Sequence, residues 1–199
     1  MSAPAERVAA IILAAGESKR FGDQKLLATL DGRPLLQHVL DVANESSLDP
    51  IVVVLGADAV VIGQRVRPGR ARVVRNIDFA SGQASSLRAG LRAIGPDSDA
   101  AVVLLGDQPL VTAPLLDDLV ARQRVSLAPA VMCAQNGRRS PPVLLHRDLW
   151  PEIEALQGDV GARDVLARRG DVAVLEVDAS RARLDDVDTP DDRERLFRR

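Results

Sequence analysis

The stretch that decides the fold lies near the start of the chain, where Val8-Ala-Ala-Ile-Ile-Leu13 is followed by Ala14-Ala-Gly-Glu-Ser-Lys-Arg-Phe-Gly-Asp-Gln-Lys25. The first part is a continuous apolar run, which is typical of a strand covered on both faces of a sheet. The second part is mostly small or charged. Because ligands of open α/β sheets bind beyond the carboxyl ends of the strands, this loop is the first place to look for chemistry.

Apolar runs alternate with stretches of helical period over the first two thirds of the chain. Strands are predicted at Val8–Leu13, Ile51–Leu55, Arg72–Arg75, Ala100–Leu105 and Ala130–Ala134. Helices are predicted between them at Leu35–Ala43, Ser85–Ile94 and Leu115–Arg122. This alternation implies right-handed βαβ units and a mainly parallel sheet, so the predicted fold class is α/β.

The pattern changes after about Cys133. Pro141–Pro142 interrupts any ladder of hydrogen bonds, so Pro142–His146 is predicted as an edge or antiparallel strand. Further elements are predicted as helices at Leu149–Leu156, Gly161–Arg168 and Pro190–Phe197, and as a strand at Val172–Val177. We interpret residues 1–199 as one domain whose C-terminal third forms a cap or a lobe for a second substrate.

Composition excludes several classes of protein. The 199 residues are 46% hydrophobic and 27% charged with a net charge of −2, which argues against disorder and against a nucleic-acid binder. One cysteine and two histidines make a disulfide framework or a zinc cluster improbable. No segment reaches the length of a membrane span and the start of the chain lacks a signal pattern, so we expect a cytoplasmic protein without membrane contact.

Lysine use singles out the first loop. Of the 26 basic residues only Lys19 and Lys25 are lysines, and both fall in this loop together with Arg20. Backbone amides of a small-residue turn can cradle phosphate oxygens, and three cations suit a triphosphate. The loop is neither a Walker A motif nor a Rossmann fingerprint. A basic surface loop in a chain with a codon bias toward arginine is the alternative.

Several later segments carry candidate site residues. Asp107 ends a buried strand, where it is a good Mg²⁺ ligand or, alternatively, a turn aspartate before Pro109. Ser85 or Ser86 could cap the following helix. Thr189 is predicted to cap the last helix, which leaves two other aspartates of that segment, Asp186 and Asp188, without a capping role. Bidentate contacts to a phosphorylated acceptor are possible for Arg138, Arg139 and Arg163, which could equally be solvated arginines.

The first loop closely resembles the signature loop of the molybdenum-cofactor guanylyl- and cytidylyltransferases, the MobA/MocA-like nucleotidyltransferases. The shared pattern is Leu13-Ala-Ala-Gly16-x-Ser18-x-Arg20-x-Gly22-x-x-Lys25, with Phe21 in place of the usual methionine. The resemblance implies a Rossmann-like three-layer α/β/α fold in which this loop wraps a triphosphate. It assigns nucleotide contacts to Leu13, Ala14, Ala15, Gly16, Ser18, Arg20, Gly22 and Lys25. Within this set Lys25 would contact the α-phosphate and Arg20 the outer phosphates, as catalytic residues together with Asp107.

Other motifs of this family follow in the expected order. The resemblance places Gly82, Ser85 and Ser86 beside the base and ribose. It makes Asp107 a metal ligand, with Asp186 ahead of Asp188 as the second ligand. Gly158-Asp-Val-Gly-Ala-Arg163 is similar to the family's acceptor motif, which implicates Asp159, Gly161 and Arg163 alongside Arg138 and Arg139. Residues 1–134 would bind the nucleotide, and residues 135–199 would form a small C-terminal lobe that binds the acceptor and completes the metal site.

The resemblance implies a Mg²⁺-dependent transfer of a nucleotidyl group that releases pyrophosphate. Ala15 favours CTP, because Leu-Ala-Ala-Gly resembles the cytidylyl enzymes and Leu-Ala-Gly-Gly the guanylyl enzymes. The expected acceptor is the molybdopterin form of the molybdenum cofactor, and a molybdenum hydroxylase apoenzyme is a possible partner. Ser140-Pro141-Pro142 departs from the family pattern, so the acceptor stays open. The alternatives are a GTP-using guanylyltransferase, a sugar- or polyol-phosphate nucleotidyltransferase, and a non-enzymatic chaperone that inserts a bound cofactor.

Overall fold

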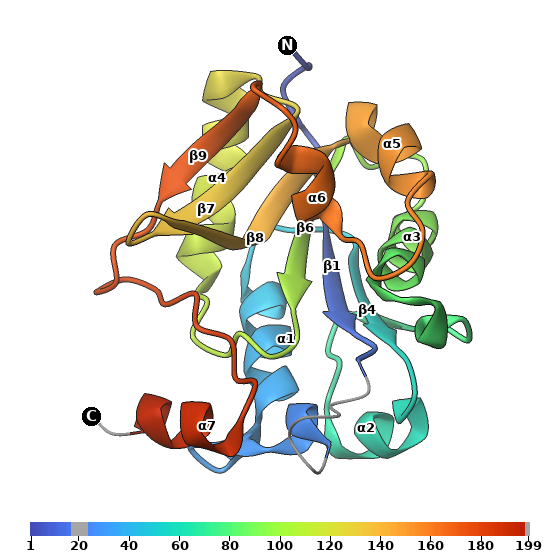
Figure 1. The fold of residues 1–199 in the computed structure, drawn as a ribbon, viewed down its shortest axis with the longest axis vertical. Helices are drawn as coiled ribbons and strands as arrows, with labels where there is room; N and C mark the ends of the chain where they lie inside the picture. Colours follow the sequence, from blue (N-terminus) through green and yellow to red (C-terminus); the bar gives the residue numbers. More distant parts are fainter. Residues whose placement is uncertain (17–23, 198–199) are drawn as a thin grey trace.

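The structure is a computed structural model, and it describes residues 1–16 and 24–197. One sheet of seven strands carries the fold, in the order β5-β4-β1-β6-β8-β7-β9 (Figure 1). Its strands are β1 (Val8–Ala14), β4 (Ile51–Leu55), β5 (Arg72–Arg75), β6 (Ala100–Leu105), β7 (Ala130–Gln135), β8 (Arg138–His146) and β9 (Val172–Glu176). A two-stranded hairpin of β2 (Thr29–Leu30) and β3 (Arg33–Pro34) stands apart from this sheet.

Helices cover both faces of the sheet. One hydrophobic core packs side chains of β1 such as Ile12 against α1 (Leu35–Glu45), α2 (Ala59–Arg65) and α4 (Ala113–Ser126). A second core packs the alternate side chains of β1, including Ile11, against α3 (Gln83–Ile94), α5 (Trp150–Glu154) and α6 (Ala162–Leu166). The period of two along a strand sends successive side chains to opposite faces, so both faces are apolar. The predicted three-layer α/β/α fold is confirmed.

Strand β8 reverses the direction of the sheet. The pairs β5–β4, β4–β1, β1–β6 and β7–β9 are parallel, whereas β8 is antiparallel to both of its neighbours, β6 and β7. This confirms the antiparallel alternative, but β8 lies inside the sheet and begins at Arg138 instead of Pro142. Because it runs backward, its first residues reach the edge where β6 and β7 end.

The proline pair of β8 forms an irregularity next to that edge. Met132 pairs with Val143 and the next residue, Cys133, pairs with Ser140, so Pro141 and Pro142 fall outside the ladder with β7. A proline has no N–H to donate, which is why an internal strand accommodates it only at such a break. Arg139 and Ser140 precede this break, at the end of β8 that lies next to the carboxyl ends of β6 and β7.

Most predicted boundaries agree with the structure to within a few residues, but two helices and a cap do not. Helix α3 begins at Gln83 after Gly82, so neither Ser85 nor Ser86 is its N-cap residue. Helices α5 and α6 are shorter than predicted, and α2 and the β2–β3 hairpin were not predicted. Short one-turn helices add η1 (Lys25–Leu27), η2 (Phe79–Ser81) and η3 (Arg147–Leu149).

The last helix, α7 (Pro190–Phe197), begins where the sequence predicted. Thr189 Oγ1 accepts a hydrogen bond from the backbone N–H of Asp192 at 3.1 Å, and the carboxylate of Asp192 accepts one from the backbone N–H of Thr189 at 2.9 Å. These reciprocal bonds form a capping box and confirm Thr189 as the cap. No helix in the described part of the chain combines the length and apolarity that a membrane span requires.

The contact between α3 and β1 generates a prediction with an internal control. A Cβ atom added to Gly90 of α3 would lie 2.4 Å from Cγ2 of the buried Ile11. Gly63, in the middle of α2, has open space at the same position. Gly90→Ala is therefore expected to lower the free energy of unfolding by about 1–3 kcal/mol through overpacking. Gly63→Ala is expected to raise it by about 0.5–1 kcal/mol, because alanine loses less backbone entropy in a helix.

Urea unfolding of the two variants and the wild type would measure this difference. Equal effects in both helices would show that Ile11 yields to the added methyl group.

Candidate active site

Three segments that are far apart in the sequence meet at the carboxyl edge of the sheet. Lys25 lies in η1 after the first loop, Asp107 follows β6, and Asp188 belongs to the segment between β9 and α7 (Figure 1). The ammonium Nζ of Lys25 donates to Asp107 Oδ2 at 2.6 Å and to Asp188 Oδ1 at 2.9 Å. Through its ammonium, Lys25 thereby connects the first loop to the two segments that carry the predicted metal ligands.

The surroundings of Lys25 keep it charged. Burial by itself would lower the pKa of the ammonium, but the charges of Asp107 and Asp188 and the hydrogen bonds to them outweigh burial and raise the pKa above its ordinary value. Only 15% of the Lys25 side chain is exposed. The site therefore holds a compact, partly desolvated positive charge, which is the kind of group that attracts a phosphate oxygen.

The segment Asp186–Asp188 is fixed by the residue between the two aspartates. Val187 is fully buried in a small cluster with Leu30 and Leu35. Its backbone N–H donates to the carbonyl oxygen of Asp107 at 3.1 Å. With Val187 directed inward, Asp186 and Asp188 lie on the exposed side of the segment, next to the β6 loop.

Asp186 has a carboxylate that resists ionisation. Its oxygen Oδ1 accepts a hydrogen bond from Nε2 of Gln108 at 2.7 Å. The residue as a whole is exposed, yet protein atoms crowd its carboxylate. This burial, followed by repulsion from Asp107, raises the pKa of Asp186 to about 6. Two carboxylates that repel each other in this way are a site for a cation.

The donor set fits a divalent metal ion. Asp107 Oδ1 is buried and has no hydrogen-bond partner among the described residues, although such an oxygen normally has one. No group of three or more His, Cys, Asp and Glu side chains in residues 1–16 and 24–197 could hold a metal without help. Mg²⁺ usually takes one or two carboxylates and completes its shell with water and substrate phosphates, so the carboxylates at this edge are sufficient.

The predicted nucleotide loop is described only at its two ends. Leu13 faces a pocket, Ala14 and Ala15 are buried, and Gly16 is exposed with open space around its Cα atom. The backbone carbonyl oxygen of Ala15 lies 2.3 Å from the position that a Cβ atom of Gly56 would take, so the loops after β1 and β4 touch. Ser18, Arg20 and Gly22 lie outside the described residues.

The β5–α3 loop packs against the predicted acceptor loop. Gly82 has a φ of +103°, and a Cβ atom there would lie 2.3 Å from backbone atoms of Gly158. The hydroxyls of Ser85 and Ser86 are buried and accept hydrogen bonds from Nδ2 of Asn76 at 2.8 Å and 3.0 Å. These bonds make Asn76 an organising residue that the sequence did not reveal. The predicted contacts of Gly82, Ser85 and Ser86 with a nucleotide stay a prediction.

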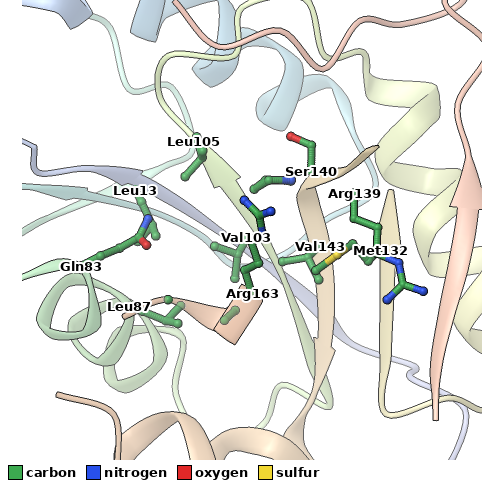
Figure 2. A pocket seen from close by; sticks show the side chains of 13 residues that line it. Leu13, Gln83, Leu87, Val103, Leu105, Met132, Arg139, Ser140, Val143 and Arg163 are labelled. Atoms are coloured by element: carbon green, nitrogen blue, oxygen red, sulfur yellow. The ribbon is translucent and has the colours of Figure 1, made fainter. Parts of the chain in front are cut away.

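A pocket opens at the ends of β1 and β6, where Leu13 and Leu105 line it. Its floor is apolar and is made of Leu13, Leu87, Val103, Leu105, Met132 and Val143. Polar groups come from the predicted acceptor residues Arg139, Gly161 and Arg163, together with Gln83 and Ser140. Figure 2 shows Arg163 near the middle of this group, with Leu13 and Gln83 to one side and Arg139 and Met132 to the other.

Two predicted acceptor residues do not line this pocket. Arg138 is exposed at the start of β8, where it pairs with Gln135 of β7. Asp159 accepts a long hydrogen bond of 3.4 Å from the backbone N–H of Gln83, at the start of α3. Asp159 therefore holds the two loops together, and its predicted contact with the acceptor stays a prediction.

The geometry and the comparisons with known proteins agree on a class of protein. The sheet lies between two layers of helices and has a lysine and several aspartates at its carboxyl edge. This arrangement matches the nucleotidyltransferase fold. A crystal structure of Rv0371c from Mycobacterium tuberculosis H37Rv matches it with a TM-score of 0.84 at 29% identity, over 97% of this chain and 98% of that one. A complex of Rv0371C with manganese matches with a TM-score of 0.79 at 26% identity, over 96% and 97% of the two chains.

The sequence comparisons give the family. The model of the MobA-like NTP transferase domain matches residues 10–173. The purine catabolism protein PucB of Bacillus subtilis (strain 168) is 33% identical over 194 residues, which cover 92% of each chain. The chain belongs to the MobA-like NTP transferase family, as the resemblance of its first loop predicted.

The raised pKa of Asp186 leads to a prediction about stability. The pKa of Asp186 in the folded protein lies above the ordinary value of 3.8. The free energy of unfolding therefore falls as the pH rises from about 4 to about 6, and this loss is complete at pH 7. Asp186→Asn removes this cost. After allowance for the solvent access of the side chain, the metal-free protein should gain about 1 kcal/mol at pH 7.5 and less at pH 5.

Urea unfolding in the presence of a chelator would measure both values. Asp185→Asn is the matched control, because Asp185 is paired with Arg183 at 2.9 Å and its neutralisation should bring no gain. A loss of stability in Asp186→Asn at both pH values would contradict the assignment.

Proposed function

We propose that this nucleotidyltransferase moves a CMP unit from CTP to a phosphorylated acceptor, the molybdopterin form of the molybdenum cofactor, in a Mg²⁺-dependent reaction. The observation that carries the proposal is the bridge of Lys25 Nζ to Asp107 and Asp188, next to Asp186 and beside a pocket with two arginines. A phosphate oxygen of the acceptor attacks the α-phosphorus of CTP, the bond from that phosphorus to the β-phosphate oxygen breaks, and pyrophosphate leaves.

Lys25 is assigned to the α-phosphate. Its ammonium is compact, carries three N–H donors and remains charged beside two carboxylates. Negative charge builds up on the phosphate oxygens as the attacking oxygen approaches, and a fixed positive charge in a partly desolvated site stabilises it more than water does. Arg20 is assigned to the outer phosphates by its place in the family pattern.

The candidate ligands of Mg²⁺ are Asp107 with Asp186, and Asp188 as the second choice. The unpartnered oxygen of Asp107 and the repulsion between Asp107 and Asp186 support this assignment. When bound, Mg²⁺ would neutralise charge on the triphosphate and orient it. The similar protein Rv0371C forms a complex with manganese in its crystal structure, which supports the use of a divalent metal.

The pocket is assigned to the acceptor. Arg139 and Arg163 offer planar guanidinium groups that bind a phosphate through two hydrogen bonds each, while the apolar floor suits a ring system. The attacking phosphate is already an anion at neutral pH, so the chain needs no general base. The residues contribute by positioning the two substrates and by excluding water.

The nucleotide and the cellular setting rest on the family pattern. Ala15 of the first loop favours CTP over GTP, and it is buried where the loops after β1 and β4 touch. We assign nucleotide binding to residues 1–134 and acceptor binding with completion of the metal site to residues 135–199. A cytoplasmic enzyme that hands its product to a molybdenum hydroxylase apoenzyme is part of the same proposal.

A panel of substrates tests this function. Pyrophosphate release would be followed with CTP, GTP, ATP and UTP, each combined with molybdopterin cofactor or with sugar and polyol phosphates, at fixed Mg²⁺. Turnover with CTP and molybdopterin is the expected result. A preference for GTP would overturn the use of Ala15, and turnover with a sugar phosphate would overturn the acceptor. Activity that survives Asp107→Ala would overturn the enzymatic mechanism.

Replacing the lysine by arginine tests the role of its shape. Arginine keeps the positive charge but spreads it over a planar fork that cannot occupy the space between Asp107 Oδ2 and Asp188 Oδ1 in the same way. Lys25→Arg is expected to lower kcat at least about tenfold, which is less than the roughly 10²–10³-fold loss seen when a charge-stabilising donor is removed altogether, because the charge is kept.

Lys19→Arg is the matched control in the same loop, since Lys19 occupies a variable position of the family pattern. Its turnover should stay near that of the wild type. Near-normal kcat in Lys25→Arg would contradict the assignment of Lys25 to the α-phosphate.

A further inference from the structure

Gln108 is a polar residue of the site that the sequence analysis assigned to no task. It follows Asp107 directly after β6, and its backbone N–H donates to the carbonyl oxygen of Leu105 at 3.3 Å. Only 1% of its surface is exposed. A long amide side chain that is this deeply buried needs partners, because an amide loses favourable hydration in the interior.

The partners of the Gln108 amide come from two different segments. Its Nε2 donates to Asp186 Oδ1 at 2.7 Å and to the carbonyl oxygen of Leu184 at 3.2 Å. The same nitrogen lies 3.2 Å from the hydroxyl oxygen of Ser140, which lines the pocket assigned to the acceptor. One amide thus joins the segment of the candidate metal ligands to the start of β8.

The orientation of this amide follows from its surroundings. Three acceptor oxygens surround Nε2, so an amide turned by 180° would bring its own carbonyl oxygen against a carboxylate and a backbone carbonyl. With the nitrogen on that side, Oε1 of Gln108 is buried and has no partner among the described residues. An unpaired buried acceptor is destabilising, so the arrangement fixes Asp186 at the expense of local stability.

The hydrogen bond to Asp186 has a consequence for metal binding. Since the amide nitrogen is bound to Oδ1, the carboxylate cannot rotate freely, and its second oxygen is presented in a constant direction. Removal of a group that orients a metal ligand through a hydrogen bond typically changes metal affinity by about 10–100-fold. Gln108 contacts Asp186 in this manner while Lys25 holds Asp107 and Asp188.

We propose that Gln108 is a positioning residue that orients Asp186 as a ligand of the divalent metal and links this ligand to the acceptor pocket through Ser140. The inference rests on the proposed function, because it takes Asp186 to be a metal ligand. It adds a residue to the site and assigns separate tasks to the two aspartates: Asp186 is oriented by a neutral amide, and Asp188 by the ammonium of Lys25.

The chain contains a matched control for this inference. Gln135 also holds the segment between β9 and α7, since its Nε2 donates to the carbonyl oxygen of Ala182 at 2.9 Å and its Oε1 accepts from the backbone N–H of Leu184 at 3.3 Å. None of its hydrogen bonds goes to Asp186. Gln135→Met therefore removes a tether of the same segment without touching the carboxylate.

The first measurement is binding of Mn²⁺ alone to the metal-free protein, followed by electron paramagnetic resonance. Gln108→Met keeps the length of the side chain and removes its hydrogen bonds. It is expected to raise the Kd for Mn²⁺ about tenfold, whereas Gln135→Met and Ser140→Ala should leave it within about twofold of the wild type. An unchanged Kd in folded Gln108→Met, or an equal rise in Gln135→Met, would overturn the inference.

The second measurement separates positioning from a structural defect. At limiting Mg²⁺ the turnover of Gln108→Met should fall about tenfold, and saturating Mg²⁺ should restore it, because the defect lies in ligand orientation. A loss that saturating Mg²⁺ does not repair would overturn the inference. If Gln108→Met does not fold, Gln108→Asn replaces it, since the shorter amide cannot span the same distance.

The two measurements also separate this inference from the proposed function. Mn²⁺ binding needs no turnover, so it reads the orientation of Asp186 even if no combination of triphosphate and acceptor reacts. A wild type that shows the expected pattern of Mn²⁺ affinities but no nucleotidyl transfer would count against the proposed function and not against the role of Gln108. A wild type that transfers CMP, with Mn²⁺ affinity insensitive to Gln108, would do the opposite.

Discussion

Mutual repulsion among carboxylates is the constraint around which this site is built. Asp107, Asp186 and Asp188 are drawn to one edge of the sheet, and Lys25 offsets part of their charge through bonds of 2.6 Å and 2.9 Å. Burial first, and then repulsion from Asp107, raise the pKa of Asp186, and Asp107 Oδ1 is buried without a hydrogen-bond partner among the described residues. A fold governed by stability alone would have placed neutral side chains there. The unrelieved charge is what makes the edge a site for a cation and a polyphosphate.

The rest of the fold serves to bring these charges together. Parallel strands end at the same edge, which places the loops after β1 and β6 side by side. The reversed strand β8 brings its first residues, with Arg139 and Ser140, to that edge as well. The buried Val187 then anchors the C-terminal segment against the β6 loop. The contacts of Lys25 with Asp107 and Asp188 join residues that are 82 and 163 positions apart, so the site exists only in the folded chain.

Particular residues show how far sequence reasoning reached. The strands of the sheet, most of its helices and the family were predicted, because apolar periodicity and the pattern from Leu13 to Lys25 are local signals. The start of α3 was predicted too late, because the positive φ of Gly82, which precedes the helix, cannot be inferred from the sequence. Ser85 and Ser86 accept hydrogen bonds from Asn76 and do not cap the helix. Gln108 directly follows Asp107 in the sequence, but its hydrogen bonds to Asp186 and Ser140 depend on two segments that sequence alone could not place.

The sequence by itself determined the fold class, the family and the identity of the charged residues, because these depend on local apolar periodicity and on one long motif. Only the tertiary structure decided how the charges pair: that Lys25 bridges Asp107 and Asp188, and that Gln108 orients Asp186. It also decided that Arg139 and Arg163 face a common pocket while Arg138 does not. The physical reason is that hydrogen bonds and ion pairs require distances of about 3 Å, and strand order and direction set these distances.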